Sequence, residues 1–220
     1  MPVMDRIDRI AFVAACRTAF DLASRPEVAD AWTSESSCEG MTVGGLAQHL
    51  LAQPERVVQL LSAAPEGDPI PAIEHYRRAA WVQSDPEAEV NIEIRTSADD
   101  AATAGHDAVL AHAREVLDDL PDVLSAHRSP DVVRVPWQGW TLTSDDFLLT
   151  RSLELVVHSD DLASSVGLRT PPMPERVVGP VLALLTNLAV ERHGQAALMR
   201  TLSRPQRAPR VVSAFHDGDA

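Results

Sequence analysis

The chain has 220 residues, a formal net charge of −13 and a pI of about 4.9. An acidic chain without a dense basic cluster has little with which to neutralise phosphates or anionic headgroups, so neither a nucleic acid nor a membrane is an expected partner. The hydrophobic fraction of 45% is enough for a substantial core, and the low aromatic content of 4% favours helices packed through aliphatic side chains.

The cellular location expected from the sequence is the cytoplasm. No run approaches the roughly 18 apolar residues that a membrane-spanning helix needs. The first 31 residues are amphipathic and carry Asp5 and Asp8, unlike a signal peptide. Cys16 and Cys38 are too few for a disulfide framework and have no CxxC spacing. Cys16 lies among apolar residues and is expected to be a core side chain.

The first half of the chain predicts two long helices and a short one. Apolar residues recur at helical period over residues 5–23, and a second helix is expected over 42–61 with Thr42 as its N-cap. Pro54 falls inside that second helix and predicts a kink or a break. A short helix is expected over 72–81, and residues 90–94 are expected to form a short extended segment.

The second half predicts two more long helices and a C-terminal one. A third long helix is expected over 97–120, ended by Pro121, and a short strand over 132–135. The next helix has the strongest signals, because Thr143 or Ser144 caps it and Gly167 stands at its C′ position. A final helix is expected over 175–192.

These elements predict an all-α fold, a four-helix bundle with an added C-terminal helix and irregular connections. Residues 1–167 are expected to form the bundle, and residues 168–220 a helix and tail packed on it. The helix over 144–166 is apolar nearly all round, which places it at the centre of the bundle.

Two residues of that central helix suggest a metal site. Glu154 and His158 are four positions apart, so they lie on one helix face, about one turn apart. Leucine and valine surround them, and a buried carboxylate needs a compensating partner. A metal ion would provide it, but a simple i,i+4 hydrogen bond in the core is an equally ordinary explanation of the pair.

His49 adds a third potential ligand. It lies between Leu46, Leu50 and Leu51 on the expected inner face of the second helix. A lone histidine on an apolar face is more often a core residue than a ligand, but two histidines and one glutamate are the ligand set of an open zinc site. The other histidines fit less well: His112 could face either way, and His75, His106 and His127 lie in polar or loop-like surroundings.

Two runs of this sequence resemble a known family. Residues 42–50 (TVGGLAQHL) and 147–162 (FLLTRSLELVVHSDDL) are similar to the metal-binding N-terminal domain of mycothiol-dependent maleylpyruvate isomerases, within the wider DinB/YfiT-like group. Residues 193–209 also look like stretches that follow this domain in related actinobacterial proteins. The resemblance therefore covers most of the chain.

The resemblance implies a DinB-like four-helix bundle that holds zinc through His49, Glu154 and His158. Water or the thiolate of a small thiol, mycothiol in actinobacteria, takes the fourth position in that family. Members that isomerise maleylpyruvate carry a sizeable second domain after the bundle, whereas about 50 residues follow Gly167 here. The substrate is therefore not fixed by the resemblance.

The expected function is a mycothiol-dependent transferase or isomerase acting on a small electrophile, with the metal lowering the pKa of the bound thiol. Arg151 could bind a carboxylate of thiol or substrate, or pair with Asp145 or Asp146; Arg77 and Arg78 are weaker candidates for the pocket rim. Asp160 and Asp161 could orient a ligand histidine.

No residue is singled out as catalytic. The alternative function is a non-enzymatic metal- or thiol-binding sensor or partner module, and a homodimer is one possible assembly. A third interpretation has no metal, with Glu154 and His158 paired in the core.

Overall fold

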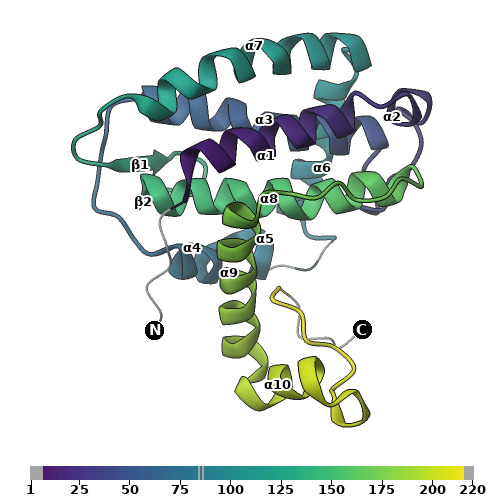
Figure 1. Ribbon diagram of the computed structural model, residues 1–220, viewed down its shortest axis with the longest axis vertical. Coiled ribbons are helices and arrows are strands. Elements are labelled where there is room, and N and C mark those ends of the chain that lie inside the picture. The colour runs from purple at the N-terminus through teal and green to yellow at the C-terminus, as the bar shows by residue number, and fades with distance from the viewer. Residues whose placement is uncertain (1–6, 84, 86, 216–220) are drawn as a thin grey trace.

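Four long helices form the body of the protein in the computed structural model, which describes residues 7–83, 85 and 87–215 (Figure 1). They are α1 (Arg9–Ala23), α3 (Val43–Ser62), α7 (His106–Ser125) and α8 (Ser144–Ser165). α3 packs against α1, α7 and α8, and α1 also contacts α7 and α8. The predicted four-helix bundle is therefore confirmed, and the fold is all-α and DinB-like.

Shorter elements surround this bundle. α6 lies against α3, and α4 lies against α8. An antiparallel hairpin pairs Val132 with Thr143 and Val135 with Trp140, and leads directly into α8. The bounds of these elements are α2 (Pro26–Asp30), α4 (Ala72–Arg78), α5 (Ala80–Gln83), α6 (Glu89–Ala102), β1 (Val132–Val135) and β2 (Trp140–Thr143).

The start and end signals of the helices act as expected. Thr42 caps α3 by accepting a hydrogen bond from the amide of Gly45, and Thr143 caps α8 by accepting from that of Asp146. Gly167, with φ of +67°, follows α8 in the left-handed conformation that favours glycine. Asp8 caps α1, and the two residues before Ile7 in the expected helix 5–23 lie outside the described residues.

Two glycines allow the start of α3 to dock closely. A Cβ on Gly45 would stand 2.0 Å from Asp99 Oδ1, and one on Gly44 would stand 2.6 Å from the Trp32 ring. The same carboxylate oxygen of Asp99, on α6, accepts hydrogen bonds from the amide and the hydroxyl of Thr42. The Gly-Gly pair thus fixes the first turn of α3, one turn before His49.

The prediction of a single helix over 97–120 is wrong. The chain forms two helices there, α6 and α7, separated by a turn at Gly105, whose φ is +89°. A glycine takes this conformation without strain, so it ends one helix and begins the next. Residues 90–94 are helical in α6 instead of extended, and α7 continues past Pro121 to Ser125.

Pro54 does not break α3, which runs without interruption from Val43 to Ser62. The missing amide costs one helical hydrogen bond, but Pro54 lies on the buried side of a helix that is packed against five others. Tertiary packing of this kind stabilises a helix more than local propensity does.

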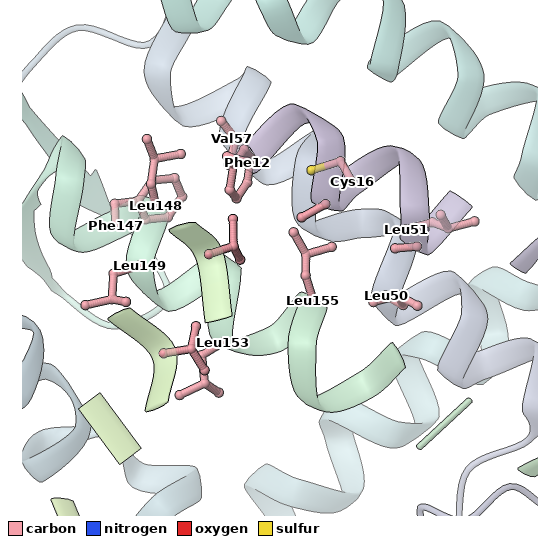
Figure 2. Close-up of a cluster of buried hydrophobic side chains, with 14 of the residues drawn as sticks. Phe12, Cys16, Leu50, Leu51, Val57, Phe147, Leu148, Leu149, Leu153 and Leu155 are labelled. Atoms are coloured by element: carbon pink, nitrogen blue, oxygen red, sulfur yellow. The ribbon is translucent and has the colours of Figure 1, made fainter. Parts of the chain in front are cut away.

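The core lies between α1, α3 and α8, as the side chains in Figure 2 show. It is mainly aliphatic, with Phe12, Tyr76 and Phe147 as its large aromatic members, and Leu50, Leu148 and Leu155 are completely buried. Cys16 is a core side chain as expected, and burial raises the pKa of its thiol. Leu153 and Leu155 hold the segment of α8 that carries Glu154 against this core.

The C-terminal segment contains α9 (Glu175–His193), α10 (Gln195–Ser203) and a 3-10 turn (Pro205–Arg207). α9 runs away from the bundle, across the direction of its helices, and α10 lies beyond it (Figure 1). Part of α9 contacts α8, α1 and α4, and Phe215 returns to stack near Tyr76 and Trp81. None of the helices in the described part of the chain is long and apolar enough to span a bilayer.

Candidate metal-binding site

α3 and α8 bring three potential metal ligands together. His49 comes from α3, Glu154 and His158 come from α8, and one donor atom of each lies within 4.8 Å of the other two. The Nε2 atoms of both histidines converge on the same carboxylate oxygen, Glu154 Oε2, at 3.1 Å for His49 and 3.4 Å for His158. The histidine rings meet edge to face with their centroids 5.0 Å apart. The three metal ligands suggested by the sequence thus form one cluster.

The cluster is largely buried but still reachable. The side chains of His49 and Glu154 are 10% and 12% exposed, and that of His158 is 23% exposed. The low exposed fraction of the Glu154 side chain leaves its carboxylate little contact with bulk water. An ionised carboxylate in such surroundings needs compensation, and the exposed fraction of His158 leaves a route for a small ligand.

Glu154 remains ionised in spite of its burial. Desolvation by itself raises the pKa of this carboxyl, but hydrogen bonds from His158 and His49, together with the charge of Arg151, hold the pKa well below its usual value. Glu154 is therefore available as an anionic ligand across the neutral pH range.

The two histidines have opposite pKa shifts. Burial lowers the pKa of His49 more than Glu154 raises it, so His49 is neutral. Burial also opposes the charged form of His158, but contacts with Asp161, Cys38 and Glu154 raise its pKa well above 6.5. In the metal-free protein a proton on His158 therefore supplies the positive charge that Glu154 requires.

Asp161 sets the orientation of the His158 ring. Its Oδ2 atom lies 2.9 Å from His158 Nδ1, so Nδ1 carries a hydrogen and Nε2 points toward Glu154. Such a carboxylate–histidine contact is the usual second partner of a metal-ligating imidazole. The neighbouring Asp160 accepts a hydrogen bond from Thr170 instead.

These donors fit a divalent ion with a preference for nitrogen and oxygen ligands. Two neutral imidazoles and a carboxylate leave one position of a tetrahedral zinc ion open, and the second partner of His158 is already in place. The same donor set also suits other borderline divalent ions. The residues therefore define a candidate metal site without naming the metal.

Cys38 is a residue that sequence reasoning missed. Its thiol, His158 and Asp161 form a second group of three potential ligands within 4.8 Å. Cys38 lies in the polar loop before α3, where no sequence pattern relates it to α8. Because Asp161 already accepts from the Nδ1 side of His158, the first group is the better candidate. It includes the carboxylate of Glu154, which is largely buried and needs a cation.

Arg151 is buried one turn before Glu154 on α8 and is only 5% exposed. Its Nη1 atom donates to Gln53 Oε1 at 2.7 Å, and its Nε atom donates to Thr150 Oγ1 at 3.1 Å. The alternative of a surface ion pair with Asp145 or Asp146 is therefore wrong. Gln53 in turn donates to the backbone carbonyl of His49, which connects Arg151 to the other helix of the site.

Arg77 and Arg78 lie on α4, each about half exposed. Arg77 pairs with Glu191 and Glu74, and Arg78 pairs with Glu74. These partners satisfy both guanidinium groups outside the cluster of His49, Glu154 and His158. Their suggested place at the pocket rim remains a prediction.

His75 does not have the polar surroundings expected from the sequence. It is only 3% exposed, and its ring packs edge to face against Tyr76 and Trp140. Burial and the charge of Arg151 lower the pKa of His75 to about 4. The sequence missed this because a short helix of mixed composition does not reveal which face it buries. The side chain of His112, by contrast, is exposed, and its Nε2 atom lies 3.4 Å from Glu55 Oε1.

A cavity of about 360 Å³ lies elsewhere, between the start of α1 and the ends of α3 and α7. Arg9, Leu61 and Arg128 are among its lining residues. Leu61 is 12 positions after His49, which is roughly 18 Å along the axis of α3. The cavity is thus separate from the cluster of potential ligands.

The fold and these three donors define a class of protein, a helical bundle with a candidate metal site between two of its helices. The family model of the mycothiol maleylpyruvate isomerase N-terminal domain matches residues 12–163, and the chain belongs to this family. The matched residues include His49, Glu154 and His158. No curated protein and no solved structure is significantly similar to the chain.

Proposed function

We propose that this protein binds a divalent metal ion, most simply zinc, through His49, Glu154 and His158, and uses a small thiol such as mycothiol to act on an electrophilic small molecule. The observation that carries the proposal is the convergence of both histidine Nε2 atoms on one buried carboxylate oxygen. Membership of a family named for a mycothiol-dependent isomerase supports the choice of thiol.

The chain's own residues have distinct parts in this proposal. His49 is already neutral and needs no deprotonation, whereas His158 gives up the proton that it shares with Glu154. Asp161 keeps the hydrogen on Nδ1 of His158, so that Nε2 is the ligand atom. The Glu154 side chain is only 12% exposed, so bulk water has little access to its carboxylate.

When bound, the metal supplies a positive charge that lowers the pKa of a coordinated thiol. The thiol proton passes to solvent, and the sulfur forms a bond to an electrophilic carbon of the substrate. In a transferase reaction a leaving group departs with its electron pair. In an isomerisation the carbon–sulfur bond breaks again after rotation about a bond within the adduct.

A titration of cobalt-substituted protein with mycothiol tests this function. Direct coordination predicts a thiolate-to-cobalt charge-transfer band that saturates with one thiol per protein. Because Cys38 lies next to His158, Cys38→Ser must be measured in parallel, so that a band from the protein's own thiol is recognised. Cys16→Ser is the matched control, since that thiol lies in the core.

A mycothiol-dependent band that persists in Cys38→Ser, with turnover of an electrophile only in the presence of thiol, supports the enzyme. A band without turnover of any electrophile would point to the non-enzymatic metal- and thiol-binding module. Absence of the band at millimolar mycothiol contradicts the thiol mechanism.

A further inference from the structure

The C-terminal arm, defined as residues 194–215, contains a helix that the rest of the molecule leaves uncovered. The arm follows α9, and Phe215 at its end packs on the ring of Tyr76. At its base, His193 Nε2 lies 2.8 Å from the carbonyl oxygen of Ser213. The contacts of α10 are mainly with α9 and the 3-10 turn, and no residue of α10 is buried. The arm is thus anchored at both ends, while α10 between them covers no part of the core.

The exposed surface of the arm is both apolar and basic. Met199 and Leu202 lie three positions apart on one face of α10 and are 54% and 73% exposed. The arm has four arginines and no aspartate or glutamate, although the whole chain has a net charge of −13. All four are exposed, and none forms an ion pair with another described residue: Arg200, Arg204, Arg207 and Arg210.

A matching acidic surface, the α7 stripe, lies on the outer side of the bundle. It consists of four exposed carboxylates at the i, i+3, i+4, i+7 spacing of one helix face: Glu115, Asp118, Asp119 and Asp122. None of them forms an ion pair within the part of the chain that the structure describes. The stripe is about 10 Å long and α10 is about 14 Å long, so one helix can lie over the other. The two surfaces therefore agree in size and are opposite in charge.

The arm does not meet the α7 stripe of its own chain. Figure 1 shows α7 and α10 at opposite ends of the longest axis of the molecule, with the bundle between them. Phe215 holds the end of the arm against Tyr76 on α4, on the side of the bundle that α9 also contacts. Two copies placed side by side in opposite directions would bring each arm to the α7 stripe of the other. Such a pair is a closed two-fold dimer, in which both contacts form together.

We infer that the C-terminal arm is a dimerisation surface, which binds the α7 stripe of a second copy of this chain. The arginines of the arm meet the carboxylates of the stripe, and the same contact covers Met199 and Leu202. A nucleic acid or an anionic membrane suits the arm less well, because the rest of the chain is acidic and repels either of them. The arm lies outside residues 12–163, which match the family model, and the dimer requires neither metal nor thiol.

Sedimentation velocity over a range of protein concentrations tests for this dimer. We expect a dissociation constant at least about tenfold higher in about 500 mM salt than in about 50 mM salt, because salt screens the charges of the contact. In low salt, the double variant Arg200→Glu, Arg204→Glu should raise the dissociation constant at least about tenfold, since attraction becomes repulsion. The double variant Arg17→Glu, Arg169→Glu is the matched control. Both of its arginines are exposed and lie outside the arm, so it should dimerise like the unsubstituted protein.

A mixing experiment identifies the two surfaces that meet. The double variant Asp118→Lys, Asp119→Lys reverses the charge of the α7 stripe and should weaken self-association as much as the arm variant does. An equal mixture of the arm variant and the stripe variant should form dimers again. In that pair the reversed arm meets the reversed stripe, and the unchanged arm meets the unchanged stripe. The double variant Asp21→Lys, Asp30→Lys changes two exposed carboxylates outside the stripe and should keep the dimer.

Three results of these measurements would overturn the inference. They are an unsubstituted protein that stays monomeric in low salt, a dimer that is unchanged in the arm variant, and a mixture of arm and stripe variants that stays monomeric. A monomer whose arm binds vesicles of phosphatidylglycerol and phosphatidylcholine would also contradict it, because the arm would then serve a lipid surface. Far-UV circular dichroism of each variant checks that these exposed substitutions leave the helices intact.

Discussion

Two buried charges stand one turn apart on α8, and their surroundings differ. Glu154 receives two histidine nitrogens at 3.1 and 3.4 Å, so the protein compensates its charge fully. Arg151 receives only an amide oxygen and a hydroxyl oxygen. Both side chains are held by the same helix and by the same partner helix, α3, so burial alone does not account for the difference.

The difference indicates two kinds of polar site in one core. At Glu154 the compensating groups are themselves metal ligands, and a proton on His158 takes the place that a cation would occupy. At Arg151 the direct hydrogen-bond partners are neutral, and the opposite charge that acts on it from a distance is that of Glu154. The two positions thus differ in their direct partners, which are potential metal ligands at Glu154 and neutral acceptors at Arg151.

The largest effect is expected from removing a metal ligand. His49→Ala or Glu154→Ala should weaken metal binding by at least about 100-fold, since loss of even an outer partner of a ligand costs 10- to 100-fold. Competition with a chelating indicator measures this affinity. His112→Ala is the matched control, because that histidine is exposed, and it should bind metal normally. An unchanged metal affinity in Glu154→Ala would show that Glu154 is not a metal ligand.

A smaller loss is expected when the support of His158 is changed. Asp161→Asn keeps an acceptor for Nδ1 but removes its charge, and should weaken metal binding by about tenfold; Asp161→Ala should approach 100-fold. Asp160→Asn, one position away, should have no effect, because Asp160 contacts Thr170. If Asp161→Asn and Asp160→Asn have the same metal affinity, Asp161 does not orient the ring of His158.

The pH dependence of metal binding follows from the opposite shifts of the two histidines. A metal ion must displace the proton of His158 but none from His49, so about one proton should be released per ion at pH 7. Metal affinity should rise about tenfold per pH unit until the raised pKa of His158 is reached. Calorimetric titrations in buffers of different ionisation enthalpy measure the release. A value near zero would mean that His158 is not the ligand.

The stability of the metal-free protein should fall with rising pH, whereas metal affinity rises. The raised pKa of His158 contributes stability that is complete below pH 6.5 and is lost as the pH rises through the folded-state pKa. The lowered pKa of Glu154 contributes stability above pH 4.5 that is lost as the pH falls. Thermal unfolding in EDTA should therefore give a lower midpoint at pH 8.5 than at pH 6, and added metal should narrow that gap.

The smallest effect on stability is expected from replacing Arg151. Arg151→Met removes two hydrogen bonds but also the cost of burying a guanidinium, so the free energy of unfolding should change by less than about 1 kcal/mol. Leu153→Ala, two positions away and equally buried, should cost about 2–5 kcal/mol. Urea unfolding of both variants checks the contrast. A loss in Arg151→Met as large as that in Leu153→Ala would show that Arg151 is a structural residue.

Local signals in the sequence predicted much of the fold. Thr42 and Thr143 cap the helices that they were expected to cap, and the apolar face of α8 lies in the core. The errors occur where tertiary structure overrides a local signal. Pro54 and Pro121 lie within continuous helices because packing stabilises them, and Gly105 divides a segment whose periodicity continues on both sides.

The candidate site was predictable where helical spacing, apolar neighbours or family resemblance marked its residues. Glu154 and His158 are related by helical spacing, and His49 was found through its apolar neighbours and through family resemblance. Cys38, His75 and the contact between Arg151 and Gln53 depend on how loops and helices pack in space. No spacing in the sequence relates those positions to one another.

A crystal structure with anomalous scattering recorded at the zinc edge tests the central claim most directly. The account predicts a single peak bonded to His49 Nε2, His158 Nε2 and a Glu154 carboxylate oxygen, at about 2.0–2.2 Å from each. A peak among Cys38, Asp161 and Nδ1 of His158 would contradict this ligand set. So would the absence of a peak from protein saturated with zinc at pH 8.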